Sequence, residues 1–94
     1  MESTTKIQTL HPQAGKTNKK IAKDKYYTVK SELIAILKGG ACTHTELMEA
    51  LYRRIHPHFE GGIQRYGETV KLDLEARGIV ERTHDKPQKY RLVK

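Results

Sequence analysis

The chain contains no tryptophan, one phenylalanine, three prolines and one cysteine in 94 residues. Because Cys42 has no partner within the chain, an intramolecular disulfide is excluded. We expect Cys42 to be a small buried residue, and we expect the protein to be in a reducing compartment, the cytoplasm. No segment approaches the ~18 consecutive apolar residues of a membrane span, and no apolar run marks a signal peptide. Hydrophobic residues make up 36% of the chain, which predicts one domain around one small core.

The sequence also lacks the residue groupings of catalytic and metal sites. His56 and His58 lie two positions apart but have no third ligand nearby, so we expect no bound metal. Gly15-Lys16-Thr17 is not preceded at position 10 by the glycine that a phosphate-binding loop requires, because Leu10 stands there. Cys42 has no evident orienting acid or oxyanion partner. We therefore expect neither an enzyme nor a cofactor.

Positive charge is in excess and unevenly placed. The formal net charge is +7 and the pI is about 9.6, which favours an anionic partner, nucleic acid before an acidic membrane surface. Residues 1–25 carry a net charge of +4, and the remaining 69 residues carry +3. The polar composition of residues 1–22 predicts a basic arm that is disordered or extended and lies outside a folded domain of residues 23–94.

Hydrophobic periodicity predicts three helices. Asp24 is a plausible N-cap for the first helix, and Gly39-Gly40 ends it. Thr43 and Glu46 have the spacing of a capping box, which predicts the start of the second helix. The predicted helices cover residues 25–38, 44–55 and 63–77.

A β-hairpin is predicted after the third helix. Gly78 is well placed to end that helix, and short apolar-rich strands follow at residues 79–82 and 90–93. His84-Asp85-Lys86-Pro87-Gln88 between them has the composition of a turn.

The segment from Leu74 to Arg82 resembles the junction between recognition helix and wing in bacterial winged-helix regulators. The start of the second helix, Thr43-His44-Thr45-Glu46-Leu47, also resembles theirs. The segment is also similar to a small, uncharacterised bacterial winged-helix family, in its Gly-Lys arm and in the run from Val70 to Gly78, and the resemblance covers residues 24–94 for the fold. The resemblance implies a mainly α fold with a small β-hairpin wing (α+β), a winged helix-turn-helix with three helices and a two- or three-stranded antiparallel sheet. Winged helices serve both DNA binding and protein assembly.

For DNA binding, the resemblance implies that the third helix enters the major groove of double-stranded DNA. The second helix would contact phosphate at its N-terminus, and the wing would reach the DNA backbone or the minor groove. The arm would add affinity but little sequence specificity. The residues expected to contact DNA are Thr43, His44, Gln64, Arg65, Lys71, Lys86, Lys89 and Arg91, with Lys16, Lys19, Lys20 and Lys23 of the arm.

The third helix also permits a different function. Its charges balance, and Leu72 projects away from the apolar stripe on the same side as Glu68 and Glu75. Recognition helices usually offer polar or basic side chains to DNA, so an outward leucine suits a protein contact. Two functions therefore stay open, a DNA-binding protein (a transcription regulator or a sequence-tolerant binder) and a module for homodimerisation or protein interaction that does not bind DNA.

Overall fold

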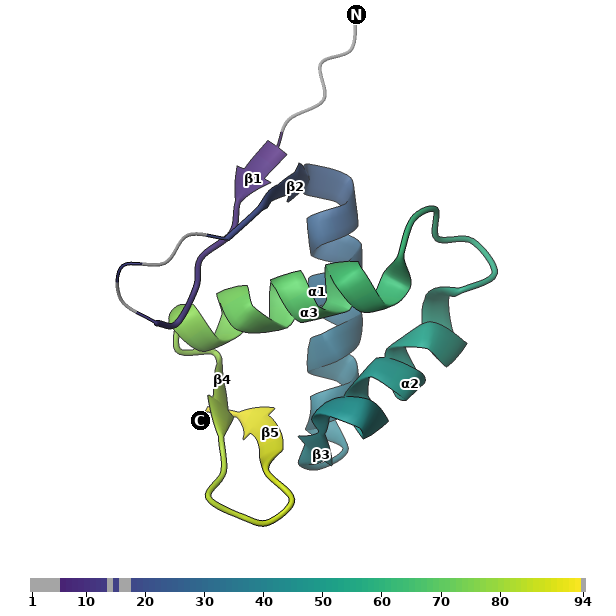
Figure 1. Cartoon of the computed structure of the whole chain (residues 1–94). Helices are drawn as coiled ribbons and strands as arrows, with labels where there is room; N and C mark the ends of the chain where they lie inside the picture. The colour runs from purple at the N-terminus through teal and green to yellow at the C-terminus, as the bar shows by residue number, and fades with distance from the viewer. Residues whose placement is uncertain (1–5, 14, 16–17, 94) are drawn as a thin grey trace, which may run out of the picture.

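The computed structural model describes residues 6–13, 15 and 18–93 and contains three helices and two antiparallel sheets. This confirms the predicted α+β class (Figure 1). The elements in chain order are β1 (Lys6–Gln8), β2 (Lys20–Ala22), α1 (Lys23–Lys38), β3 (Cys42–Thr43), α2 (His44–Ile55), α3 (Ile63–Ala76), β4 (Val80–Arg82) and β5 (Lys89–Leu92).

The helices pack around one core, with α3 crossing α1 (Figure 1). Close approach of α2 and α3 requires a glycine, because a Cβ at Gly67 would lie 2.7 Å from Leu51 Cδ2 and 2.8 Å from Met48 Sδ. The fully buried side chains include Val29, Leu33, Leu47, Leu51, Ile55, Val70 and Leu74. The three helices therefore interlock through the apolar stripes that the sequence predicts.

The capping box of α2 is present as predicted. The Thr43 hydroxyl accepts a hydrogen bond from the Glu46 backbone N–H at 3.1 Å, and the Glu46 carboxylate accepts one from the Thr43 N–H at 2.9 Å. At the other helices the boundaries differ slightly. Helix α1 begins at Lys23 after Ala22, so Asp24 lies inside the first turn and is not the N-cap.

The second sheet joins the connection between α1 and α2 to the C-terminal hairpin, in the strand order β3-β5-β4. Cys42 of β3 pairs with Tyr90 of β5, and Glu81 of β4 pairs with Arg91 of β5. Cys42 is half-buried in β3, and burial raises the pKa of its thiol. The thiol form is therefore favoured, as expected for a structural cysteine.

The N-terminal region differs from the expected disordered or extended arm. Its described residues form a hairpin in which Ile7 pairs with Ile21. Ile21 is only 7% exposed and belongs to the core, and Thr9 is 1% exposed. Scattered apolar residues in a polar segment did not indicate burial, because their partners lie on the opposite strand and on distant helices. Residues 6–22 are thus continuous with the folded domain where the structure describes them.

Candidate nucleic-acid interface

One long face of α3 is left open by the core. Gln64, Arg65 and Glu68 are exposed, and Leu72 is half-buried. Glu75 on the same face is engaged, since its carboxylate accepts a hydrogen bond from Arg82 Nε at 2.6 Å and its side chain is 5% exposed. The open face therefore offers fewer free groups than the helical pattern suggested, and Leu72 does not stand free of the surface.

Lys71 is not on this open face, which corrects the sequence prediction. The residue is 4% exposed, and its Nζ lies 3.7 Å from the centroid of the Tyr90 ring on β5. This distance is typical of a cation–π contact. Lys71 sits at the border of the buried stripe of α3, where β5 covers it, so helical periodicity alone did not reveal its burial.

The predicted contacts at the start of α2 are partly occupied. The Thr43 hydroxyl already accepts the hydrogen bond of the capping box. His44 is half-buried, and burial, followed by the charge of Lys71, lowers the pKa of its imidazole, while Glu68 opposes this effect. A lowered pKa keeps His44 neutral near pH 7, so His44 supplies no positive charge to a phosphate.

The β4–β5 hairpin provides one clearly exposed cation near its tip. Lys86 is exposed in the β4–β5 loop, and Lys89 is half-buried. Arg91 forms an ion pair with Glu81 on the neighbouring strand at 2.6 Å. Among the three predicted wing contacts, Lys86 is thus the residue whose charge is most accessible.

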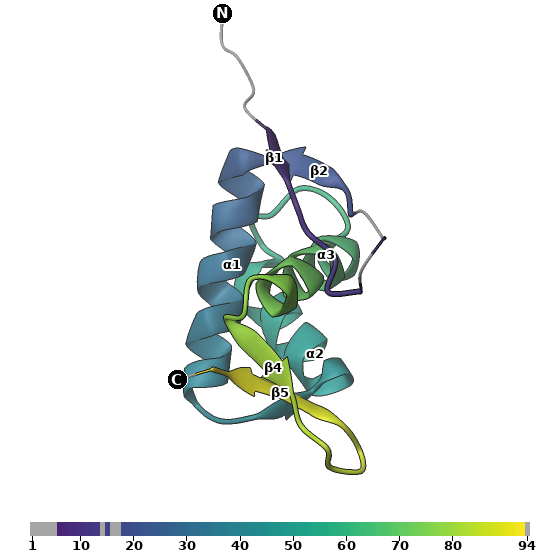
Figure 2. The ribbon, with the colours of Figure 1, turned by 90° about the vertical axis from the view of Figure 1, so that its left-hand side faces the viewer.

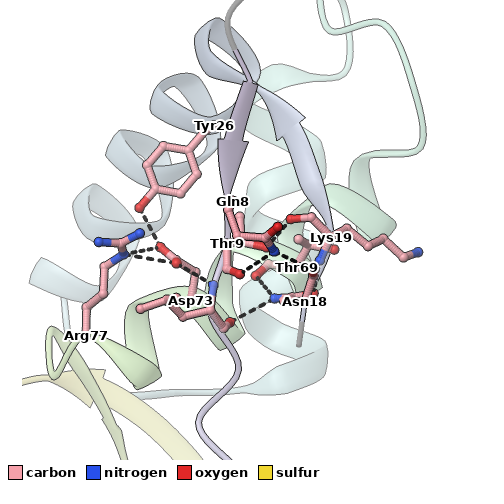
Figure 3. A network of polar contacts seen from close by, with 9 residues as sticks. Gln8, Thr9, Asn18, Lys19, Tyr26, Thr69, Asp73 and Arg77 are labelled. Carbon is pink, nitrogen blue, oxygen red and sulfur yellow. Dashed lines mark hydrogen bonds and ion pairs between the residues drawn. The ribbon is translucent and has the colours of Figure 1, made fainter. Parts of the chain in front are cut away.

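A buried carboxylate fastens the N-terminal hairpin to α3 (Figure 3). Asp73 is 0% exposed. Its Oδ1 accepts the backbone N–H of Leu10 at 2.8 Å, and its Oδ2 accepts the Tyr26 hydroxyl. Arg77 Nε donates to both carboxylate oxygens, at 2.9 and 2.8 Å. One carboxylate therefore links the hairpin, α1 and α3.

The same network changes the ionisation of its tyrosine. Burial, followed by the hydrogen bond to Asp73, raises the pKa of Tyr26 to about 12. The hydrogen bond to Asp73 also raises the pKa of Arg77, which stays charged. The neutral phenol thus remains the donor to Asp73 across the physiological range.

A second set of hydrogen bonds holds the described ends of the β1–β2 connection. Asn18 Nδ2 donates to the backbone carbonyls of Leu10 and Thr69, each at 3.0 Å (Figure 3). The Thr9 N–H donates to the Lys19 carbonyl at 3.1 Å. The hairpin is therefore attached to α3 at Thr69 as well as at Asp73, one helical turn apart.

Two hairpins accordingly lie on the same side of the molecule as α3. In Figure 2 the described part of the β1–β2 connection lies beside α3 and the β4–β5 loop lies below it, both facing away from α1. Lys19, Lys20 and Lys23 are exposed, whereas Lys16 lies outside the described residues. Lys19 and Lys20 line a cleft together with Arg65.

A separate groove runs between α2 and α3, with a volume of about 410 Å³. Tyr52 lines it and is 54% exposed. The Tyr52 ring stacks on His56 with centroids 4.7 Å apart. The other lining residues are Thr45, Met48, Glu49, Arg53 and Gln64.

The described part of the chain, residues 6–13, 15 and 18–93, has neither a metal-binding cluster nor a membrane-spanning helix. No cluster of three or more His, Cys, Asp or Glu side chains has a geometry that would hold a metal ion. Within the same residues, no helix combines the length and apolarity needed to cross a membrane.

Sequence reasoning missed the residues that attach the hairpin. Tyr26 and Asn18 gave no signal of this role, because their partners are remote in sequence. A weak signal was Asp73 itself, an acidic residue next to Leu74 on the buried side of a helix, since buried carboxylates are almost always paired.

Among known proteins, the chain matches one family model. A family model described as a family of unknown function (DUF6958) matches residues 6–90. Because the match covers most of the chain, the chain belongs to this family. No curated protein and no solved structure matches it.

Proposed function

We propose that this member of the DUF6958 family is a winged helix-turn-helix protein that binds double-stranded DNA, as a transcription regulator or a sequence-tolerant binder. The chain order α1, β3, α2, α3, β4, β5 and the sheet order β3-β5-β4 support the winged-helix assignment. In this assignment α3 is the recognition helix, and the β4–β5 hairpin is the wing.

The observation that carries the proposal is the placement of α3 between two hairpins on one side of the molecule (Figure 2). Cations accompany each part of this surface, with Lys19 and Lys20 by the first hairpin, Arg65 on α3 and Lys86 on the wing. A duplex lying along α3 would meet phosphate-binding groups on both flanks, and phosphate contacts supply most non-specific affinity.

The composition of α3 favours contacts with the DNA backbone over specific contacts with base edges. Gln64 and Arg65 are exposed side chains of the kinds that hydrogen-bond to base edges. Glu68 opposes the approach of phosphate, and Lys71 is buried. We therefore infer weak sequence preference and strong dependence of the affinity on salt.

Fluorescence anisotropy with a random duplex at 50 and 200 mM salt tests the proposal. We expect binding at low salt and a steep fall in affinity at high salt. Absence of binding at low salt would refute DNA binding. The contribution of the β1–β2 hairpin to DNA affinity is tested by Lys20→Gln. Removal of residues 1–22 would also expose the Asp73 carboxylate, so a loss of affinity could not be separated from a loss of stability.

A second candidate function, protein interaction or homodimerisation, is favoured by the groove between α2 and α3. It combines the exposed Tyr52 ring with Met48 and the paired charges Glu49 and Arg53. Under this proposal Leu72→Asp or Tyr52→Asp would disrupt self-association measured by sedimentation, with an unchanged circular dichroism spectrum. An unaltered oligomeric state in both variants would count against it.

A further inference from the structure

A basic cleft lies between β2 and the beginning of α3. Its volume is about 360 Å³. The lining residues are Lys19, Lys20, Ile21, Gly61, Gly62, Arg65, Tyr66 and Thr69. Three of these carry a positive charge, and among the described residues that line the cleft none is acidic. The hairpin and α3 create this concentration of charge together, so neither segment has it alone.

Arg65 differs from the other arginines of the chain. Within residues 6–13, 15 and 18–93 it forms no ion pair with a carboxylate. By contrast, the arginines that do form such pairs are Arg53, Arg54, Arg77, Arg82 and Arg91. An exposed arginine that lines a cleft beside two lysines retains its donors for an external anion, and its planar fork matches phosphate oxygens.

A fourth cation stands at the edge of the cleft. Lys25 Nζ lies 5.2 Å from the Tyr66 ring centroid and 5.6 Å from the Phe59 ring centroid. Phe59 and Tyr66 in turn meet edge to face, with centroids 5.3 Å apart. These cation–π contacts hold the ammonium beside Gly61, so the positive charge at this edge is positioned by the fold.

Gly61 lines the cleft with backbone alone. This residue has φ of +115°, and a Cβ there would lie 2.9 Å from the Tyr66 ring. The Tyr66 ring packs against this glycine, so a side chain does not fit there. The first-turn N–H groups of α3 lie at the same end, because Gly62 is its N-cap and forms no side-chain cap. Their dipole adds to the potential that the cationic side chains create.

We propose that this cleft is a phosphate-binding site. Building on the proposed function, it takes one backbone phosphate of duplex DNA, in addition to the contacts of the wing. The charge, the absence of lining carboxylates among the described residues and the backbone exposed at Gly61 and Gly62 all suit a tetrahedral oxyanion. The site lies at the N-terminal end of α3, so it would fix the position of α3 along the duplex.

The first test compares the salt dependence of duplex affinity in Arg65→Gln with that in Lys38→Gln. Lys38 is the control because it is an exposed cation at the C-terminal end of α1, whereas β2, which lines the cleft, directly precedes the N-terminal end of that helix. We expect Arg65→Gln to lower the slope of log K against log salt by about 0.9 and to weaken binding roughly tenfold at 100 mM salt. Lys38→Gln should keep the wild-type slope. Equal slopes in all three proteins would overturn the proposal.

The second test uses inorganic phosphate alone, so it does not depend on DNA binding. Phosphate replaces chloride at constant ionic strength while amide chemical shifts are followed by NMR. We expect the Gly61 and Gly62 amides to shift in the wild type and not in Arg65→Gln. Absence of such shifts, or shifts unaffected by the substitution, would overturn the site.

The two tests separate the cleft from the proposed function. Phosphate shifts together with no duplex binding would refute DNA binding and support the cleft as a site for a free phosphate group. If the protein binds the duplex but inorganic phosphate still shifts the Gly61 and Gly62 amides, the assignment to a backbone phosphate of DNA would be overturned. Displacement of phosphate by the duplex is the outcome we expect.

Discussion

Asp73 Oδ1 accepts the backbone N–H of Leu10 at 2.8 Å, although the two residues are 63 positions apart. This hydrogen bond connects the N-terminal hairpin to the helix that we propose reads DNA. Tyr26 and Arg77 donate to the same buried carboxylate, so every oxygen of Asp73 has a partner. The position of Lys19 and Lys20 beside α3 therefore depends on a residue that is itself fully buried.

Replacement of the carboxylate should destabilise the protein. Asp73→Asn puts an amide N–H₂ group where donors from Leu10, Tyr26 and Arg77 converge, so at least one of them loses its acceptor. We expect the free energy of unfolding to fall by about 2–4 kcal/mol. Urea denaturation measures this change. Asp85→Asn in the exposed β4–β5 loop is the matched control, and an equal loss in both variants would contradict the role of Asp73.

Stability should decrease at alkaline pH through Tyr26. Its pKa is raised in the folded protein from 10.0 to about 12, so the folded state holds the phenol proton more tightly than the unfolded state. This contribution is fully present below pH 10 and is lost as the pH rises toward 12, at most about 3 kcal/mol.

Thermal unfolding at pH 9 to 11.5 tests the contribution of this phenol. Tyr26→Phe removes it and should show a shallower decline with pH than the wild type, despite lower stability at pH 8. Tyr52→Phe, at a ring that is 54% exposed, should follow the wild-type decline. Parallel curves for wild type and Tyr26→Phe would show that another group causes the alkaline loss.

Gly67 sets the distance between α2 and α3. In Gly67→Ala the new methyl group would meet Leu51 Cδ2 at 2.7 Å and Met48 Sδ at 2.8 Å, so the two helices must separate or repack. We expect a loss of about 1–3 kcal/mol in the free energy of unfolding, despite the better helix propensity of alanine. Gly39→Ala, whose nearest neighbour would be 3.4 Å away, should change stability little.

Lys71 should contribute to packing and not to DNA affinity. Lys71→Met keeps most of the buried stem but removes the ammonium that lies 3.7 Å from the Tyr90 ring centroid. We expect a stability loss of about 0.5–2 kcal/mol from the cation–π contact and an unchanged salt slope for duplex binding. A slope reduced as in Arg65→Gln would show that Lys71 reaches phosphate after all.

Local sequence patterns predicted the elements well wherever the relevant contacts are near in sequence. The capping box at Thr43 is visible from the spacing of two residues, and the apolar stripes of the helices repeat every three to four positions. The burial of Lys71 was missed, because periodicity gives the direction of a side chain but not what covers it. The sequence also named Arg65, Lys19 and Lys20 individually without indicating that they share a cleft.

The sequence by itself determined the three helices, the β-hairpin that follows them, the single core and the excess of positive charge, since each depends on composition or on neighbours within a few residues. Only the tertiary structure decided that residues 6–13 and 18–22 join the domain, that Asp73 is a buried junction and that Arg65 lies beside Lys19 and Lys20. Those features arise from pairs of residues far apart along the chain. Their free energy is gained only when the folded core brings them together, so no local pattern records them.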